Sequence, residues 1–325
     1  MVKKTGHSLL AIAGLALGTT CLLFALLYVR EELSYDRFHE KADRIYRISQ
    51  DLTPPSGEVV NTVFTQIIMA PTLIKDFPEM AEVARIMPWF EGAVPGKVAV
   101  RRQEKGQEKQ SYEWFAWADG SLPRIFDLPL IEGDPAKVLV APNSVVLSEP
   151  IARKIFGDEP AVGKVLKIDS GYSDENYRVT GVMRELPSNS HFHFHVLASF
   201  SSLDHVTDPR LIRDNWWAND VYTYFLLAEG ASAEQIEKKL PAFVEKYYPK
   251  VPGASAAMRL QRLRDIHLHS DQFGEIEPGG DPRNVKIAAA VALFVLLITA
   301  LTFLVLTAPR PSFKRALTLA AAGAA

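Results

Sequence analysis

The chain has 325 residues, of which 48% are hydrophobic, and a formal net charge of −2 at pH 7. That length accommodates one or two folded domains. The nearly balanced charge gives no basis for nucleic-acid binding, and a single cysteine, Cys21, excludes a disulfide framework within the chain.

Two apolar stretches without a charged residue occupy positions 9–29 and 287–307. At about 1.5 Å per residue, each would extend roughly 30 Å, which is the thickness of the hydrocarbon core of a bilayer. A helix satisfies its own backbone hydrogen bonds inside lipid, so both stretches are predicted to be transmembrane helices. The first is longer than the apolar region of a cleaved signal peptide and is interpreted as an uncleaved anchor.

Basic residues flank both spans on their short sides: Lys3, Lys4, Arg310, Lys314 and Arg315. The positive-inside rule therefore predicts that 1–8 and 308–325 are cytoplasmic and that 30–286 lies outside the cytoplasm. These features predict a multi-pass protein of the cell inner membrane, in contact with membrane lipids and carrying a large periplasmic domain.

The segment 30–286 is predicted to form an α+β domain, because runs of strands and helices follow one another with few βαβ spacings. Alternating apolar residues and turn signals predict strands at 44–52, 82–88, 98–102, 113–118, 144–147, 165–169, 177–184, 190–200, 221–228 and 258–268. Apolar residues at helical spacing predict helices at 34–43, as a stalk continuing the first span, and at 62–76, 148–156 and 232–248. Ser148 is expected to cap one helix, Gly157 to end it, and Pro241 to bend the last.

Several passages together resemble the amino-terminal half of MacB/FtsX-type ABC transporter permeases. Their order and spacing form a coherent set that runs through nearly the whole chain. They are AGLALG at 13–18, ELSYDRFH at 32–39, ADRIYRI at 42–48, FDLPLIEGDP at 126–135, VLSE at 146–149, IFGDE at 155–159 and YRVTGV at 177–182.

The resemblance implies a MacB-like periplasmic core domain between the first two of four spans, and a partner ATPase whose motions the spans transmit outward. That ATPase would be a separate ABC ATPase subunit. A homodimer or a second permease half is also expected as a partner, because two spans with a GxxxG face are not expected to form a stable gate alone. After 307 the chain departs from the family pattern, because a short tail that begins Ala308-Pro309-Arg310-Pro311 stands where that family has a basic cytoplasmic stretch and two more spans.

Three histidines, His191, His193 and His195, alternate along a predicted strand, so they would share one face as metal ligands do. The simpler interpretation places Phe192 and Phe194 in the core and the histidines in water. No Asp, Glu or Cys clusters beside the triplet, so no metal site and no cofactor are expected.

Two glycine-containing patterns are weaker indications of function. The stretch GDEPAVGKV at 157–165 resembles a phosphate-binding loop, but it has the wrong spacing and follows a helix instead of a strand, so it is interpreted as a turn. Gly14 and Gly18 form a GxxxG pattern, and small residues allow transmembrane helices to approach closely. The two glycines are therefore predicted to lie in a helix-packing face.

No nucleophile, base and orienting group occur in a recognisable catalytic pattern, so the chain is not expected to be an enzyme. Trp216 and Trp217 are interpreted as aromatic residues under a loop. The favoured function is a partial permease subunit whose outer domain transmits ATPase-driven motion to a substrate or partner outside the membrane. The alternatives are a two-span sensor or receptor, which the short tail disfavours, and an inactive fragment of a longer permease.

Overall fold

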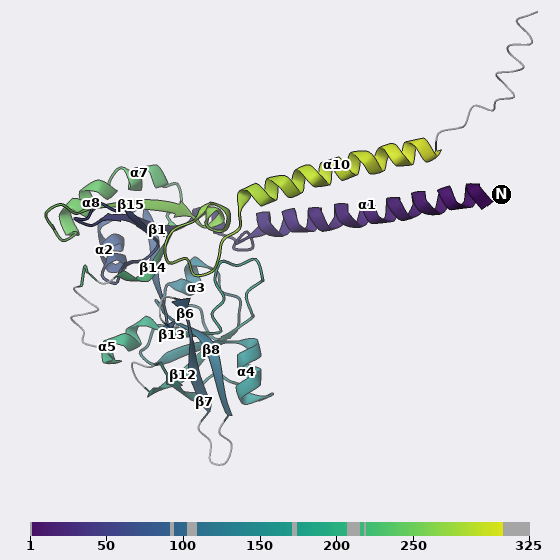
Figure 1. Cartoon of the computed structure of the whole chain (residues 1–325). Coiled ribbons are helices and arrows are strands. Elements are labelled where there is room, and N and C mark those ends of the chain that lie inside the picture. The colour runs from purple at the N-terminus through teal and green to yellow at the C-terminus, as the bar shows by residue number, and fades with distance from the viewer. Residues whose placement is uncertain are drawn as a thin grey trace, which may run out of the picture. The chain divides into compact units, whose positions relative to one another are not determined.

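The computed structural model of the chain describes residues 2–91, 94–102, 109–170, 174–206, 215–217 and 219–307 (Figure 1). The chain divides into two compact units. The helical unit consists of Met1–Leu33 and Asp281–Ala325, and the folded domain consists of Ser34–Gly280. Residues 103–108 and the basic tail beyond 307 lie outside the described residues.

The helical unit contains α1 (Val2–Ser34) and α10 (Pro282–Thr307). These two are the helices in the described part of the chain that are long and apolar enough to cross a membrane. Large apolar side chains remain exposed along both, including Leu17, Phe24 and Phe294. A helix that is apolar all round suits hydrocarbon, since water would not tolerate so much exposed apolar surface.

The folded domain is mixed α and β, as the sequence predicted. Its described strands are β1 (Ile45–Thr53), β2 (Val60–Thr62), β3 (Thr65–Gln66), β4 (Met80–Pro88), β5 (Phe90–Glu91), β6 (Val94–Pro95), β7 (Lys97–Arg102), β8 (Lys109–Ala118), β9 (Leu130–Glu132), β10 (Ser144–Ser148), β11 (Val165–Asp169), β12 (Asp174–Met183), β13 (Val196–Ser199), β14 (Asn219–Leu227) and β15 (Ser255–Arg262). Its described helices are η1 (Ala42–Arg44), α2 (Met69–Asp76), α3 (Leu122–Ile125), α4 (Glu149–Phe156), η2 (Phe200–Ser202), α5 (Leu203–Val206), α7 (Ala233–Glu237), α8 (Leu240–Tyr247), η3 (Leu263–Asp265) and α9 (Ile266–His269).

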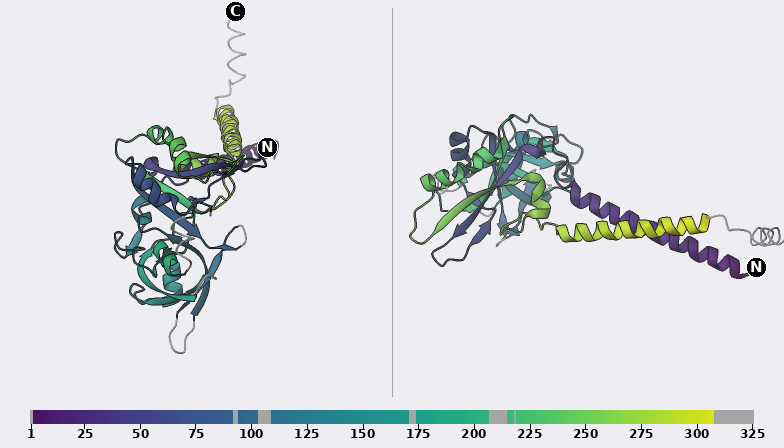
Figure 2. Two further views of the ribbon diagram at one scale, coloured as in Figure 1. Left: turned by 90° about the vertical axis from the view of Figure 1, so that its left-hand side faces the viewer. Right: turned by 90° about the horizontal axis from the view of Figure 1, so that it is seen from above.

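Among the described residues, thirteen strands form one sheet with the main order β13-β10-β12-β11-β7-β8-β4-β14-β1-β15. A further pairing of β13 with β8 joins the first six strands of this order into a closed ring, visible as curving blue and teal strands in the left view of Figure 2. The remaining strands, β4, β14, β1 and β15, extend from the ring as an open antiparallel sheet. Closure leaves the strands of the ring without unpaired edges.

The ring is filled by apolar side chains at every second position of its strands. Pairs such as Val98 and Val100 in β7, or Phe115 and Trp117 in β8, belong to one buried cluster. A second cluster lies between the open sheet and helices α2, α7 and α8, which Figure 1 shows beside β1 and β15.

A third cluster contains residues of both parts, such as Ala116 and Leu197 from the ring and Ile45 and Tyr224 from the open sheet. The ring and the open sheet are therefore joined by shared buried side chains as well as by the β4–β8 pair.

Most elements predicted with clear start and stop signals are present, such as the β10–α4 unit. Gly157 ends α4 with φ +67°, as expected, whereas the Ser148 hydroxyl makes no capping hydrogen bond. The stretch after Gly157 is a turn between α4 and β11, the opposite order from a phosphate-binding loop.

Besides the strand predicted at 190–200, of which only Val196–Ser199 forms β13, four predicted elements differ from the structure. The stalk helix at 34–43 is wrong, because α1 ends at Ser34 and Asp36 takes a left-handed backbone with φ +56°. The helix predicted at 62–76 begins only at Met69, since Thr65 and Gln66 pair with β14 as β3.

The other two differences lie nearer the carboxyl end. The helix predicted at 232–248 is interrupted before α8. Pro241 lies in the first turn of α8 and has no backbone N–H to donate within a continuous helix. The strand predicted at 258–268 ends at Arg262, and the chain continues as the short helices η3 and α9.

Gly133 provides a test of the fold. It has φ +104°, and a Cβ there would lie 2.6 Å from the carbonyl oxygen of Thr180, so Gly133→Ala requires the backbone to move. We expect urea unfolding of the purified protein to show a loss of at least about 3 kcal/mol. Gly230 has φ +75° but open space around it, so Gly230→Ala should cost only about 1 kcal/mol. Equal losses in the two variants would contradict the close approach at Gly133.

Candidate functional site at the two ends of the folded domain

The residues that follow α1 are held by hydrogen bonds to a distant loop. The backbone N–H of Asp36 donates to the carbonyl of Asn189 at 2.8 Å. The side-chain amide of Asn189 in turn donates to the Ser34 hydroxyl at 2.8 Å and to the Ser34 carbonyl at 3.1 Å. The chain therefore enters the domain through a fixed turn, here called the amino-terminal connection (residues 34–41).

Asp36 begins a chain of buried polar groups. Its Oδ1 accepts a hydrogen bond from the backbone N–H of His191 at 3.1 Å and lies 2.9 Å from Nδ1 of the same residue. The Nε2 of His191 lies 2.8 Å from the hydroxyl of Tyr224 in β14. All three side chains are buried, so these contacts stabilise groups that would otherwise be costly to remove from water.

Tyr224 continues the chain of polar groups to an ion pair. The guanidinium of Arg47, on β1, hydrogen bonds the Tyr224 oxygen and donates to both carboxylate oxygens of Glu275 at 2.7 Å. Burial raises the pKa of Tyr224, which keeps its hydroxyl protonated. The Arg47 side chain is 0% exposed, so its charge depends on the carboxylate of Glu275 for compensation.

His267, in α9, contacts both ends of the domain. The ring of Tyr35, the first residue after α1, stacks on the His267 ring with centroids 3.3 Å apart and planes 1° from parallel. The N–H of Gly280, the last residue of the domain, donates to the His267 carbonyl at 2.7 Å. A Cβ on Gly279 would lie 2.7 Å from that same oxygen, so the backbone approaches it as closely as only glycine allows.

The cavity beside these groups measures only about 10 Å³, which is the lower limit for holding one water. Tyr35, His191, His267 and Glu275 all line it. So small a space favours a mechanical role for these side chains over a ligand site. The buried polar groups from Asp36 to Glu275, together with His267, are here called the joint. Residues 270–280, called the carboxy-terminal connection, and the amino-terminal connection are thus attached to the same few side chains.

The three histidines at 191–195 do not lie on a strand, since β13 begins only at Val196. Each contacts a different carboxylate: His191 contacts Asp36, His193 contacts Glu277 and His195 contacts Glu113. The hydrogen bond to Glu277 raises the pKa of His193.

The prediction that Phe192 and Phe194 lie in the core is confirmed, because both side chains are buried. The simpler interpretation fails for His191, which is buried and not in water. Within the described residues, no three His, Cys, Asp or Glu side chains gather as metal ligands would.

The two glycines of the GxxxG pattern have different surroundings. A Cβ on Gly18 would lie 3.0 Å from the Thr299 hydroxyl of α10, whereas a Cβ on Gly14 would meet nothing within 4 Å. A shared helix-packing role for the two glycines stays a prediction.

Sequence reasoning missed the polar joint. Asp36 and Arg47 lie inside the family-like passages at 32–39 and 42–48, and Arg47 was a charge in an otherwise apolar stretch. Glu275 and Tyr224 carried no comparable signal, because their partners lie 228 and 33 residues away.

The sequence matches the family described as MacB-like periplasmic core domain over residues 8–243. The chain belongs to this family. Its resemblance to MacB/FtsX-type permeases is thereby confirmed, and so is its α+β outer-domain fold with apolar helices at both ends. Permeases of this kind work with ABC ATPase partners.

Solved structures with a similar fold include a domain assigned to a permease from Porphyromonas gingivalis. It is 20% identical with a TM-score of 0.57, and the match covers 77% of this chain and 98% of that one. The periplasmic region of MacB from Actinobacillus actinomycetemcomitans is 14% identical with a TM-score of 0.44, covering 69% and 91%. The extracellular domain of the noncanonic ABC-type transporter YknZ from Gram-positive bacteria is 14% identical with a TM-score of 0.41, covering 66% and 99%. No curated protein matches the sequence.

His39, in the amino-terminal connection, gives the MacB-like domain a pH dependence. Its Nδ1 lies 2.7 Å from the Phe126 carbonyl, which can only accept, so this nitrogen carries the proton of a neutral ring. Burial lowers the pKa of His39 from 6.5 to about 4. The unfolded chain therefore binds a proton that the folded domain does not between these values, and stability falls as pH falls through this window.

We expect the free energy of unfolding to decrease by up to about 3 kcal/mol from this residue between pH 6.5 and pH 4. His39→Gln should flatten the curve over that window, because glutamine cannot take up the proton. His269→Gln, at an exposed position, should keep the wild-type slope and serves as the matched control. Urea unfolding at a series of pH values measures all three, and identical slopes for His39→Gln and wild type would contradict the assignment.

Proposed function

We propose that the chain is a membrane permease subunit of a MacB/FtsX-type ABC transporter, in which the folded domain transmits ATPase-driven motion to a substrate or partner outside the membrane. The observation that carries the proposal is the joint at His267. Both connections of the domain contact this residue, one by ring stacking and the other by a backbone hydrogen bond. Motion of either connection would therefore be delivered to the same place in the domain.

The joint replaces a continuous stalk as the means of coupling. Since α1 ends at Ser34, rigidity at this point depends on hydrogen bonds from Asn189 and on the buried Asp36–His191 pair. The driving energy would come from a separate ABC ATPase subunit. A homodimer or a second permease half would complete the assembly, and Gly18 against Thr299 would contribute to the packing of the spans.

The proposal also places the folded domain on the periplasmic side of the cell inner membrane, with both termini in the cytoplasm. In a Cys21→Ala background, Glu58→Cys puts a thiol at an exposed position of the folded domain. A membrane-impermeant maleimide should label it in spheroplasts. A cysteine appended after Ala325 should react only after permeabilisation. The reverse pattern would show that the topology is wrong.

The functional test begins with the tagged chain, extracted into lipid nanodiscs from the cells that encode it. We expect an ABC ATPase to copurify and to be identified by mass spectrometry. Addition of ATP and vanadate should then change hydrogen exchange in peptides that cover α9 and residues 275–280. Copurification of no ATPase would overturn the proposal and favour an inactive fragment.

Coupling through the joint is tested by inserting Gly-Gly-Gly after Ser34, where it separates α1 from Asp36. This variant should still bind the ATPase but lose the ATP-dependent change in exchange, because the connection no longer holds Tyr35 against His267. The same insertion after Gly230, in an exposed turn before α7, should behave as wild type. An unchanged response in the Ser34 variant would exclude coupling through this connection.

A further inference from the structure

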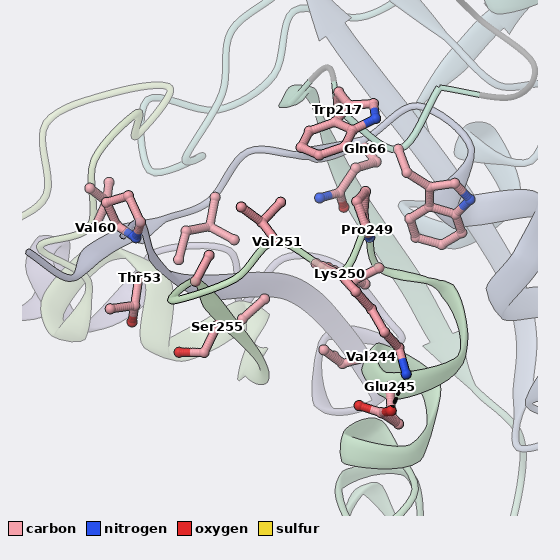
Figure 3. A pocket seen from close by; sticks show the side chains of 16 residues that line it. Thr53, Val60, Gln66, Trp217, Val244, Glu245, Pro249, Lys250, Val251 and Ser255 are labelled. Carbon is pink, nitrogen blue, oxygen red and sulfur yellow. Dashed lines mark hydrogen bonds and ion pairs between the residues drawn. The ribbon is translucent and has the colours of Figure 1, made fainter. Parts of the chain in front are cut away.

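A cavity of about 590 Å³ lies at the far end of β1, between that strand and the carboxyl end of α8 (Figure 3). Its volume falls in the range of about 300–1,000 Å³ that small-molecule sites occupy. Thr53 and Val60 lie at one end of the view, Val244 and Lys250 at the other, and Trp217 above them. The space is far larger than the one at the joint and shares no lining residue with it.

Aromatic rings form one wall of the cavity. Trp216 is held in place by neighbouring rings, stacking on Tyr247 with centroids 5.4 Å apart and contacting Phe243 edge-on at 6.1 Å. Trp217 is 68% exposed, an unusual state for so large an apolar side chain. The small side chains of β15, including Ala256, leave the opposite side open.

The charges of the lining are neutralised internally. Lys250 and Glu245 form an ion pair with one another, and both are exposed at the rim. The remaining lining residues are apolar or uncharged. The cavity therefore offers no net charge to attract an ionic ligand.

Gln66 supplies a polar group inside this apolar surface. Its side chain is 2% exposed, and within the described residues its Oε1 accepts no hydrogen bond. Its Nε2 lies 3.4 Å from Oε1 of Gln50 and within hydrogen-bonding reach of Tyr248. The Tyr248 hydroxyl donates to the same Gln50 oxygen at 2.6 Å. A buried acceptor without a donor is costly, and a ligand that donates a hydrogen bond would remove that cost.

We propose that this cavity binds an uncharged, ring-containing apolar molecule that carries one hydrogen-bond donor. The rings would pack against Trp216 and Trp217, and the donor would reach Gln66 Oε1. Lys250 and Glu245 would remain paired at the rim. The site goes beyond the proposed function, because binding here requires neither an ATPase nor a second permease half.

The probe is 4-(hydroxymethyl)benzophenone, a neutral two-ring donor that attaches to nearby C–H bonds under ultraviolet light. The full chain in nanodiscs is irradiated with it and digested, and labelled peptides are quantified by mass spectrometry. We expect labelling of peptides that contain Trp216 or residues 249–256, in addition to any labelling of the spans by probe dissolved in lipid. The methyl ether of the probe, which has no donor, should label the cavity about three- to tenfold less, the range for one buried hydrogen bond. A carboxylate analogue, 4-benzoylbenzoate, should label it least.

Two variants locate the site. Ala256→Phe fills the cavity and should lower its labelling roughly tenfold or more, a loss equivalent to about 1.4 kcal/mol. Ala257→Phe is the matched control, because the next residue of β15 points to the opposite face and does not line the cavity, so its labelling should equal that of wild type. Gln66→Leu should remove the difference between the probe and its methyl ether.

Circular dichroism identifies any variant that fails to fold. Where a variant fails to fold, Trp217→Ala, at an exposed position, is used in its place and should lower labelling of the cavity. Absence of label from the cavity peptides in wild type would overturn the proposal. So would stronger labelling by the carboxylate than by the neutral probe, or equal labelling of folded Ala256→Phe and Ala257→Phe.

Discussion

The buried charge of Arg47 is the constraint on which the ends of the MacB-like domain depend. A guanidinium removed from water needs acceptors, and Glu275, Gln261 and Ser270 accept hydrogen bonds from its two terminal nitrogens. Within the described residues its Nε has no partner, so these contacts to the terminal nitrogens carry the compensation. Removal of one partner from such a pair typically costs about 3–5 kcal/mol, because the other charge stays buried and uncompensated. Glu275 is thereby fixed above β1, and with it the carboxy-terminal connection.

The same network reaches the amino-terminal connection through Tyr224 and His191 to Asp36. Segments that are more than 200 residues apart thus share one set of hydrogen bonds, and neither connection can shift without disturbing the other. Elsewhere the domain has simpler means of stability. The ring of strands formed within residues 97–199 closes on its own apolar core, and the open sheet is covered by helices on one face.

Local patterns predicted the elements whose signals lie in their own residues. β1, β4, β11 and β12 follow runs of apolar residues bounded by turns, and Gly157 ends α4 because glycine tolerates its positive φ. The apolar helices followed from composition alone. The overall α+β class followed from the order of these elements.

The rest of the structure depends on partners far along the chain. The alternation at 191–195 is typical of a strand, yet each histidine is held by a carboxylate 82 to 155 residues away, which no local pattern reveals. Thr65 became part of a strand because β14 offers it a backbone partner and its hydroxyl meets that of Thr223. The polar joint was missed for the same reason, since Asp36 and Glu275 acquire their roles only when β1 and β14 bring them together. The cavity, by contrast, contains Trp216 and Trp217, which the sequence singled out without assigning them a ligand.

The strand order also has a consequence for synthesis of the chain. β1 pairs with β14 on one side and with β15 on the other, at residues such as Phe225 and Arg262. At a ribosomal rate of about 5–20 residues per second, roughly 10–40 seconds separate the synthesis of β1 from that of its outer neighbour. During that interval β2 can pair with the second half of β1, but residues 45–47 of β1 have no neighbouring strand until β14 is made. The ring, although made later than β1, can already close on itself. β1, the first strand of the domain to be made, is therefore the last to be fully paired. The time for which it is open to proteases and aggregation is set by the translation of the ring.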